Sequence, residues 1–340
     1  MEVSFPKLGL EFEINRVAFT LFGMDIYWYA VLIMTGFILA VLYAWKSTKT
    51  FDVKFDPLID IVLVGLFCGI AGARIYYVIF RLNSYNSLWD MINIRDGGLA
   101  IYGGVIMAFL SGLIMCRYIE KVEILPVFDI AAVGFLIGQC IGRWGNFMNQ
   151  EAFGSETSLP WGMYSAHTYY YNTVDGVSQK VGPTTVHPCF LYESLWCLTG
   201  FLLLHFISRR YYKFKGQMFL SYLVWYGLGR AWIEGLRTDS LWLVEDVIKV
   251  SQLLAIVCVL AAGALLFMGW NDIPVRLPRI RRAQNGKGIA GLGFEAEVFD
   301  LPFQPTKLWL VSHREATEPQ TSQETPETET ETVEEIVPEE

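Results

Sequence analysis

The sequence has none of the short motifs that mark a nucleophilic serine, a catalytic metal or a phosphate-binding loop. The patterns GxSxG, HExxH and Walker A are absent, and no cysteine stands at a suggestive spacing from a histidine. These absences leave a serine hydrolase or a metalloenzyme without support. We therefore expect no metal, no cofactor and no nucleic-acid partner.

Cysteine occurs at only six positions, without a CxxC pair or a metal-ligand spacing. All except Cys189 lie inside or at the edge of apolar runs, where cysteine acts as a small packing residue. The sequence therefore predicts no disulfide framework. A cleavable signal peptide is not expected either, because the first 23 residues have scattered charges in place of a basic start and an apolar core.

Charge is scarce over long stretches of the chain. Hydrophobic residues make up 53% of the 340 residues, and the mean hydropathy is +0.36. Seven apolar runs are each close to the roughly 20 residues that cross a bilayer. They are Tyr27–Trp45, Leu58–Phe80, Leu99–Cys116, Ile124–Ile141, Phe190–Ile207, Met218–Leu236 and Gln252–Trp270. This pattern predicts an all-α integral membrane protein with seven transmembrane helices.

Basic residues are unevenly distributed between the loops that join these runs. The loops after the first, third, fifth and seventh runs are rich in lysine and arginine, whereas those after the second, fourth and sixth carry fewer. Under the positive-inside rule, this predicts an N-terminus outside and a C-terminus in the cytoplasm. The long polar segment 150–187, between helices four and five, is then extracytoplasmic.

Acidic charge is concentrated at the C-terminal end. The formal net charge is -8, but residues 291–340 carry 13 acidic and 2 basic side chains, while the other 290 residues carry 21 acidic and 24 basic ones. We expect a membrane domain over residues 1–275 and a basic, then mixed, cytoplasmic segment over 276–316. The remaining tail, 317–340, is rich in glutamate, threonine and proline, so it is predicted to be disordered in the cytoplasm.

Three arginines lie in apolar runs, or directly after one, near the predicted outer face of the membrane. Arg74, Arg143 and Arg230 belong to separate helices in this topology. A charge at this depth is costly and usually faces the protein interior for a functional reason. A phospholipid phosphate is an anion found at that level, and guanidinium groups bind phosphate in a bidentate way. Arg74 alone is weaker evidence, and snorkelling to the membrane surface is a serious alternative for it.

The stretch Gly142–Gly154, GRWGNFMNQEAFG, follows the fourth apolar run. It combines an arginine, two asparagines, a glutamate and three glycines, with the aromatic side chains of Trp144 and Phe147 between them. Such a set is suited to holding an anionic, hydrogen-bonding head group at the membrane surface. A capping and anchoring turn, with Arg143 snorkelling and Trp144 in the aromatic belt, fits the spacing equally well.

Arg230, Glu234 and Arg237 share one face of the sixth predicted helix. Their spacing is i, i+4 and i+7, which places the three side chains one above the other. This face either points to a functional site in the protein interior or forms a salt-bridged stripe that makes the helix tolerable in lipid.

Further polar and small residues fall on the same predicted outer side. His187, with Tyr192 and Glu193, offers hydrogen-bonding groups just before and within the fifth run, although a lone histidine is more often structural than catalytic. The paired glycines Gly103 and Gly104 let helices or a lipid tail approach closely.

These residues resemble the signature of the prolipoprotein diacylglyceryl transferases. Within Gly142–Gly154 the matching positions are Gly142, Arg143, Gly145, Asn146, Phe147, Asn149, Glu151 and Gly154. Further matches are Trp28 and Tyr29, Gly72 to Arg74, Gly103 and Gly104, His187 and Pro188, Tyr192 and Glu193, and Arg230, Glu234 and Arg237. The resemblance covers about residues 20–270.

The resemblance implies a fold, a location and a reaction. The fold is seven membrane helices in a bacterial plasma membrane, with an active site facing the outer leaflet. The reaction transfers the diacylglyceryl group of phosphatidylglycerol to the lipobox cysteine thiol of a prolipoprotein, giving a thioether and glycerol 1-phosphate. This is the first step of bacterial lipoprotein maturation, and the partners it implies are phosphatidylglycerol, the lipobox segment and membrane lipids.

The resemblance also implies roles for individual residues. Arg143 and Arg230 match the essential arginines of the family and are expected to hold the phosphate and stabilise its leaving charge. The catalytic candidates are Arg143, Arg230, Tyr102 and Glu151. The substrate-binding candidates are Arg143, Asn146, Asn149, Gly154, Tyr29, Arg74, Glu234, Arg237, His187, Gly103 and Gly104.

Tyr102 is where the chain departs from many family members, which have a histidine before the paired glycines as the proposed base. A phenol with a pKa of about 10 is a poor base at neutral pH. Tyr102 then only positions other groups, or Glu151 or His187 takes the thiol proton, or the cationic site lowers the pKa of the thiol itself. We favour the last of these alternatives.

Overall fold

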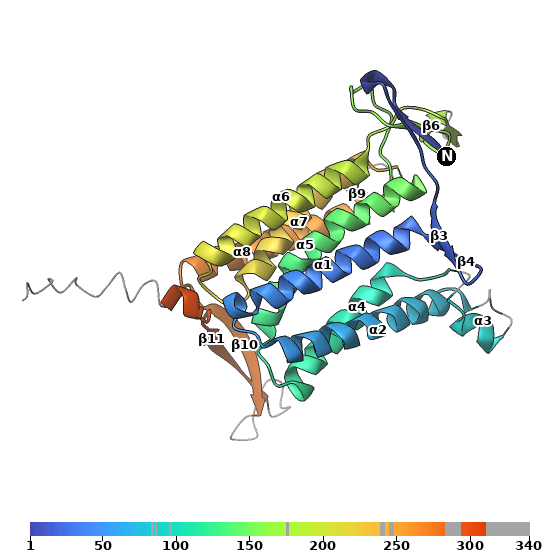
Figure 1. Ribbon diagram of the computed structural model, residues 1–340. Helices are drawn as coiled ribbons and strands as arrows, with labels where there is room; N and C mark the ends of the chain where they lie inside the picture. The colour runs from blue at the N-terminus through green and yellow to red at the C-terminus, as the bar shows by residue number, and fades with distance from the viewer. Residues whose placement is uncertain are drawn as a thin grey trace, which may run out of the picture.

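The protein is a bundle of long helices that run side by side (Figure 1). The computed structural model describes residues 1–82, 85, 87–94, 97–174, 177–238, 242–244, 248–282 and 294–310. The long helices are α1 (Trp28–Phe51), α2 (Phe55–Ile79), α4 (Ile101–Ile114), α5 (Ile124–Asn149), α6 (Cys189–Arg210), α7 (Gln217–Leu236) and α8 (Val250–Trp270). Helices α2 and α4 form a pair, while α5 packs against α1, α6 and α7. The central helix of the bundle is therefore α5.

Six helical segments in the described part of the chain are long and apolar enough to cross a membrane. They are α1, α2, α5, α6, α8 and the segment Ile101–Ile119, in which α4 continues into a π-helix (Met115–Ile119). The remaining predicted run, Met218–Leu236, is also helical, as the 20-residue α7, but Arg230 and Glu234 lower its mean hydropathy. The chain is therefore a mostly helical integral membrane protein, and a seventh span stays a prediction.

The central helix α5 continues further than its apolar run. Its predicted end was Ile141, whereas the helix ends at Asn149, with Gln150 in the left-handed conformation. The last turns of the helix contain glycine because they pack closely against α1. A Cβ at Gly145 would lie only 2.6 Å from Cδ2 of Tyr29. Arg143 therefore lies on a helix, and the alternative of a capping turn directly after the apolar run does not hold.

Small β-sheets lie at the end of the bundle that carries the N-terminus (Figure 1). Strand β1 (Glu2–Phe5) pairs antiparallel with β2 (Leu10–Glu13) and with β5 (Tyr164–Ser165), which comes between α5 and α6 in the sequence. Val3, Met163 and Val186 form a buried core there. The all-α prediction was wrong for this end, because the N-terminal residues and the polar segment fold on each other. The other elements here are β3 (Val17–Leu21), β4 (Met24–Tyr27), β6 (Tyr170–Val174), β7 (Val177–Val181), β8 (Trp242–Val244), β9 (Ile248–Lys249), the 3-10 helix Pro6–Leu8 and α3 (Leu88–Ile92).

A two-stranded hairpin follows α8 at the other end of the bundle. The register of β10 (Val275–Arg282) and β11 (Phe294–Leu301) sets Arg276 opposite Asp300 and Arg279 opposite Glu297. The register thus sets a basic strand beside an acidic one. This hairpin falls in the segment predicted as basic and then mixed, whereas the predicted acidic tail, 317–340, lies outside the described residues.

A buried carboxylate joins α5 to the start of α7. Asp129 of α5 is fully buried and accepts hydrogen bonds from the Tyr212 hydroxyl (2.5 Å) and from the backbone N–H groups of Gly216 (2.6 Å) and Phe219 (2.8 Å). The N–H groups at a helix start lack partners within their own helix. Asp129 therefore caps α7 from a neighbouring helix and fixes the two helices that carry Arg143 and Arg230.

Replacing Asp129 by asparagine should lower the free energy of unfolding in detergent by about 2 kcal/mol. The substitution removes a charged acceptor, and the new amide NH2 group would face the buried hydrogen-bond donors that the carboxylate now accepts from. Thermal unfolding followed by circular dichroism measures this change. The control is Asp25→Asn, because Asp25 is exposed and accepts only from Thr20 among the described hydrogen bonds. Equal melting temperatures for the two variants would contradict the structural role of Asp129.

Candidate active site

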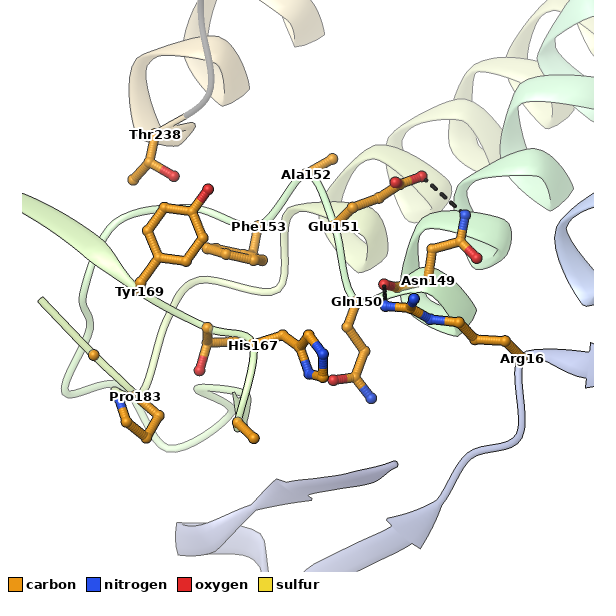
Figure 2. A pocket seen from close by; sticks show the side chains of 13 residues that line it. Arg16, Asn149, Gln150, Glu151, Ala152, Phe153, His167, Tyr169, Pro183 and Thr238 are labelled. Carbon is orange, nitrogen blue, oxygen red and sulfur yellow. Dashed lines mark hydrogen bonds between the residues drawn. The ribbon is translucent and has the colours of Figure 1, made fainter. Parts of the chain in front are cut away.

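The end of α5 presents a fixed group of amides and a carboxylate. Oε1 of Glu151 accepts hydrogen bonds from Nδ2 of Asn146 (3.1 Å) and from Nδ2 of Asn149 (3.2 Å). Figure 2 shows that Arg16 approaches from another side, where its Nη2 donates to the backbone carbonyl of Asn149 over 2.8 Å. The carboxylate of Glu151 is thus oriented while its side chain stays exposed.

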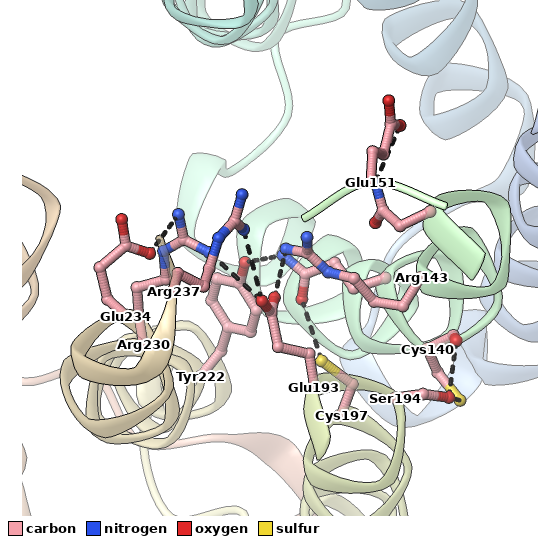
Figure 3. A network of polar contacts seen from close by, with 12 residues as sticks. Cys140, Arg143, Glu151, Glu193, Ser194, Cys197, Tyr222, Arg230, Glu234 and Arg237 are labelled. Carbon is pink, nitrogen blue, oxygen red and sulfur yellow. Dashed lines mark hydrogen bonds and ion pairs between the residues drawn. The ribbon is translucent and has the colours of Figure 1, made fainter. Parts of the chain in front are cut away.

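The centre of the polar network is Glu193 in the second turn of α6, a side chain that is only 6% exposed. Its carboxylate lies 2.5 Å from Nη2 of Arg143, 3.5 Å from Nη1 of Arg230 and 3.6 Å from Nη1 of Arg237. Figure 3 shows the three guanidinium groups converging on this carboxylate from α5 and from the end of α7. One acidic side chain therefore joins three basic ones from two other helices.

The network retains an excess of positive charge. Arg230 also pairs with Glu234 over 2.7 Å, so three guanidinium groups face two carboxylates. The side chains of Arg143 and Arg230 are 20% and 21% exposed, whereas those of Glu193 and Glu234 are 6% and 4% exposed. The cations thus face outward over buried carboxylates. Such an arrangement is suited to binding an anion, because the guanidinium groups are already held in place.

Two stacked tryptophans set the distance between α6 and α7. The rings of Trp196 and Trp225 lie 4.5 Å apart, and each indole N–H donates to the backbone carbonyl of the other residue over 2.9 Å. Gly200 faces Trp225 and Gly229 faces Trp196, with no room for a Cβ at either glycine. This contact fixes the two helices that supply Glu193 and its α7 partners.

Gly154 allows the chain after α5 to run between two neighbours. Its N–H donates to the His187 carbonyl over 2.9 Å, and a Cβ at this position would lie 2.7 Å from Cβ of His187. The His187 ring itself lies beside Tyr192, with 3.2 Å between Nδ1 and the hydroxyl oxygen. Burial lowers the pKa of His187 below its ordinary value, so the imidazole is neutral at pH 7. Gly154 is thus a packing residue, and His187 is a neutral hydrogen-bonding group.

Tyr29 and Tyr102 lie in the first turns of α1 and α4. Tyr29 packs against Gly145, which connects α1 to the last turns of α5. Tyr102 is 53% exposed, and none of the hydrogen bonds between described residues involves its hydroxyl. Gly103 and Gly104 face α2, where a Cβ at Gly103 would lie 2.4 Å from the Gly72 carbonyl oxygen. The paired glycines therefore serve the close approach of α2 and α4.

Arg74 holds the connection between α2 and α4. Its Nε donates to the carbonyl of Met91 (2.9 Å), its Nη1 to those of Gly97 (2.7 Å) and Gly98 (2.9 Å), and its Nη2 to that of Asp90 (2.7 Å). The guanidinium group is buried in these contacts. It does not join the Glu193 network, so its role as a substrate ligand stays a prediction.

Most of the candidate residues form three groups, while Tyr29, Gly154 and His187 pack around the end of α5 and the chain that follows it. The first comprises Arg143, Arg230, Glu234 and Arg237 around Glu193, the second comprises Asn146, Asn149 and Glu151, and the third comprises Arg74, Tyr102, Gly103 and Gly104 on α2 and α4. Sequence spacing relates Glu193 only to its neighbour His187 and says nothing of arginines on other helices. The available signal was a carboxylate inside an apolar run, which requires a partner.

The chain is similar to proteins of known class. Residues 16–268 match the family model described as prolipoprotein diacylglyceryl transferase. A phosphatidylglycerol–prolipoprotein diacylglyceryl transferase of Finegoldia magna is 42% identical over 253 residues, which cover 74% of this chain and 94% of the relative. Its counterpart from Clostridioides difficile is 41% identical over 247 residues, covering 72% and 92% of the two chains. The match includes the Glu193 network and leaves out the β10–β11 hairpin.

Replacing Arg74 by lysine should loosen the segment between α2 and α4, because an ammonium group cannot reproduce four hydrogen bonds from a planar fork. Amide hydrogen exchange in residues 88–94 and 97–98 is expected to become faster, with little change in α5. The control is Arg81→Lys, whose side chain is exposed and lies over the Tyr77 ring. Unchanged exchange in the Arg74 variant would contradict the assigned contacts.

Proposed function

The chain belongs to the prolipoprotein diacylglyceryl transferase family, and from this premise we propose that it transfers the diacylglyceryl group of phosphatidylglycerol to the lipobox cysteine of prolipoproteins. The bond that forms joins the cysteine sulfur to the glyceryl carbon. The bond that breaks joins that carbon to the phosphate oxygen, so glycerol 1-phosphate leaves with the electron pair. The observation that supports this function best is the outward-facing excess of positive charge around Glu193.

The site acts from the outer leaflet of a bacterial plasma membrane, in a chain with seven spans and a cytoplasmic C-terminus. The 20 residues of α7 rise about 30 Å, the thickness of a hydrocarbon core. α7 packs against α5, α6 and α8, and its carboxylate Glu234 is buried between helices. The basic loops support this orientation. Residues 1–275 then form the membrane domain, and 276–340 form a cytoplasmic extension.

Arg143 and Arg230 bind the phosphate group of the lipid. As the carbon–oxygen bond breaks, negative charge grows on the departing phosphate, and cations held at a site of low dielectric stabilise that charge most strongly. Glu193 keeps both guanidinium groups in position before the lipid binds. Glu234 pairs with Arg230 and keeps it oriented, and Arg237 extends the same network through Glu193.

The polar groups at the end of α5 orient the rest of the head group. Asn146, Asn149 and Glu151 offer amide and carboxylate groups to the glycerol hydroxyls, and Tyr29 lies against the same end of α5. Gly154 and His187 hold the chain that closes this side. Their packing keeps the chain after Glu151 at the end of α7, where the Ser155 N–H donates to the Leu236 carbonyl. The α2–α4 pair, with Arg74, Gly103 and Gly104, provides the wall facing the lipid.

The thiol loses its proton with the help of the cationic site. The thiolate is the nucleophile, and nearby guanidinium groups lower the pKa of a thiol. Tyr102 is not required as a base in this route, and a phenol at neutral pH accepts a proton poorly. Glu151 and neutral His187 are the alternative acceptors.

Arg143→Ala and Arg230→Ala should each reduce lipid transfer at least about a hundredfold, as expected for the loss of a group that stabilises transition-state charge. Transfer is measured as the mass gain of a lipobox peptide incubated with purified protein and phosphatidylglycerol. The control is Arg209→Ala, because Arg209 lies at the opposite end of α6 and bonds to Ser47. No mass gain with the unaltered protein would overturn the function, and full activity in Arg143→Ala would overturn the site.

Tyr102→Phe should keep transfer within about tenfold of the unaltered protein, since loss of a general base typically costs a hundredfold or more. Tyr118→Phe, on the π-helix that continues α4, is the matched control. A complete loss of transfer, with phosphatidylglycerol binding intact, would make the Tyr102 hydroxyl part of the proton transfer.

A further inference from the structure

A cavity of about 560 Å³ lies beyond the end of α5. Figure 2 shows it between the last residues of that helix, the chain around His167, the turn at Pro183 and the side chain of Arg16. Its volume falls within the range of small-molecule sites. Glu151 lines it as well, so the cavity adjoins the group of amides assigned to the lipid head group.

Gln150 brings an unusual side chain to this cavity. It is only 4% exposed, yet neither its Nε2 nor its Oε1 has a hydrogen-bond partner among the described residues. Buried polar groups nearly always have partners, and leaving one without costs about 1–3 kcal/mol. The Nε of Arg16 is buried and unpartnered in the same part of the structure. The Gln150 carboxamide therefore offers the cavity one donor group and one acceptor that have no partner among the described residues, and Arg16 Nε offers a second donor.

The backbone at Gln150 adds an independent indication. Its φ is 54° and its ψ is 49°, the left-handed conformation that usually ends a helix with glycine. A residue with a side chain costs about 1 kcal/mol or more in this conformation. Strain of this kind is concentrated at functional sites. The long amide is thus held in the cavity at a backbone cost that glycine would avoid.

The chemistry of the lining favours a peptide over the other occupants. A carboxamide donates through its nitrogen and accepts through its oxygen, so it matches the C=O and N–H of a peptide group. An acyl chain would leave the Gln150 amide without partners. A phosphate would meet the Glu151 carboxylate, with Arg16 as the nearby cation. A polar, uncharged backbone satisfies all three side chains.

We propose that this cavity binds the backbone of the residues that follow the lipobox cysteine, with the Gln150 carboxamide paired to a peptide group. This inference rests on the proposed function, in which the lipobox cysteine of the prolipoprotein reacts at the outer leaflet. The cavity lies on that side, next to Glu151. A peptide held there sets its cysteine beside the lipid head group.

The test compares Gln150→Gly and Gln150→Leu with the unaltered protein. Glycine suits the left-handed backbone, so Gln150→Gly should melt at the same temperature or higher, whereas a purely structural glutamine would lower it. Gln150→Leu keeps the volume and removes the amide. The control is Gln304→Gly, because Gln304 is exposed near the C-terminal hairpin at the opposite end of the bundle.

Two fluorescent lipobox peptides serve as probes, one ending at the cysteine amide and one continuing for six further residues. Their dissociation constants are measured by anisotropy in detergent without phosphatidylglycerol, and their KM values in the transfer assay. Both Gln150 variants should weaken binding of the longer peptide about tenfold, as for one lost hydrogen bond. Binding of the shorter peptide, kcat and the KM for phosphatidylglycerol should not change.

Equal affinity of the longer peptide for the unaltered protein and both variants would overturn the proposal. Water would then be the hydrogen-bond partner of the Gln150 amide. An equal loss for both peptides would also overturn it, since the effect would not depend on the residues after the cysteine. Tight binding that requires Gln150, without any lipid transfer, would support the cavity assignment and refute the transferase function. The two conclusions are therefore tested separately.

Discussion

The carboxylate of Glu193 is the group that allows three arginines to share one site. Guanidinium groups repel each other at short distance in a medium of low dielectric, and a buried charge without a partner is strongly destabilising. Glu193 reaches Arg143, Arg230 and Arg237 from a third helix, and Glu234 adds a second pairing to Arg230. The pairing is incomplete by one charge, and the cations are its exposed part. The same network thus stabilises the helix packing and leaves one positive charge unneutralised, which a bound anion would neutralise.

The position of Glu193 depends on contacts along the whole length of the helices. At one end, Asp129 caps α7 from α5, and farther along α6 and α7 the stack of Trp196 and Trp225 sets their separation. At the other end, Gly154 lets the chain after α5 pass between His187 and the last residues of α7. The stack combines ring contacts with hydrogen bonds between neutral groups, and hydrogen bonds also hold both ends. The charged network therefore rests on a frame that holds without a bound lipid.

The sequence predicts those features that one helix carries alone. Each of the seven apolar runs is a helix, and the common face of Arg230, Glu234 and Arg237 is read from their spacing. Features that arise between segments escape such a reading. The end of α5 was misplaced because apolarity measures contact with lipid, whereas its last turns pack against Tyr29. The β1–β5 pairing joins residues some 160 apart in the chain, and no periodicity connects them. The role of Glu193 at the site could not be predicted for the same reason, since its partners lie on other helices.

The end of α5 supplies side chains to two surfaces at once. Arg143 points to the Glu193 network, Asn146 and Asn149 hold Glu151, and Gln150, turned by its left-handed backbone, faces the cavity. A reaction that joins a lipid to a peptide has to fix the distance between them, because effective concentration depends on the geometry of the bound pair. Two surfaces built on one rigid helix end hold that distance without a moving part. A loop in place of the last turns of α5 would supply the same side chains without fixing their separation, which explains why the helix continues beyond its apolar run.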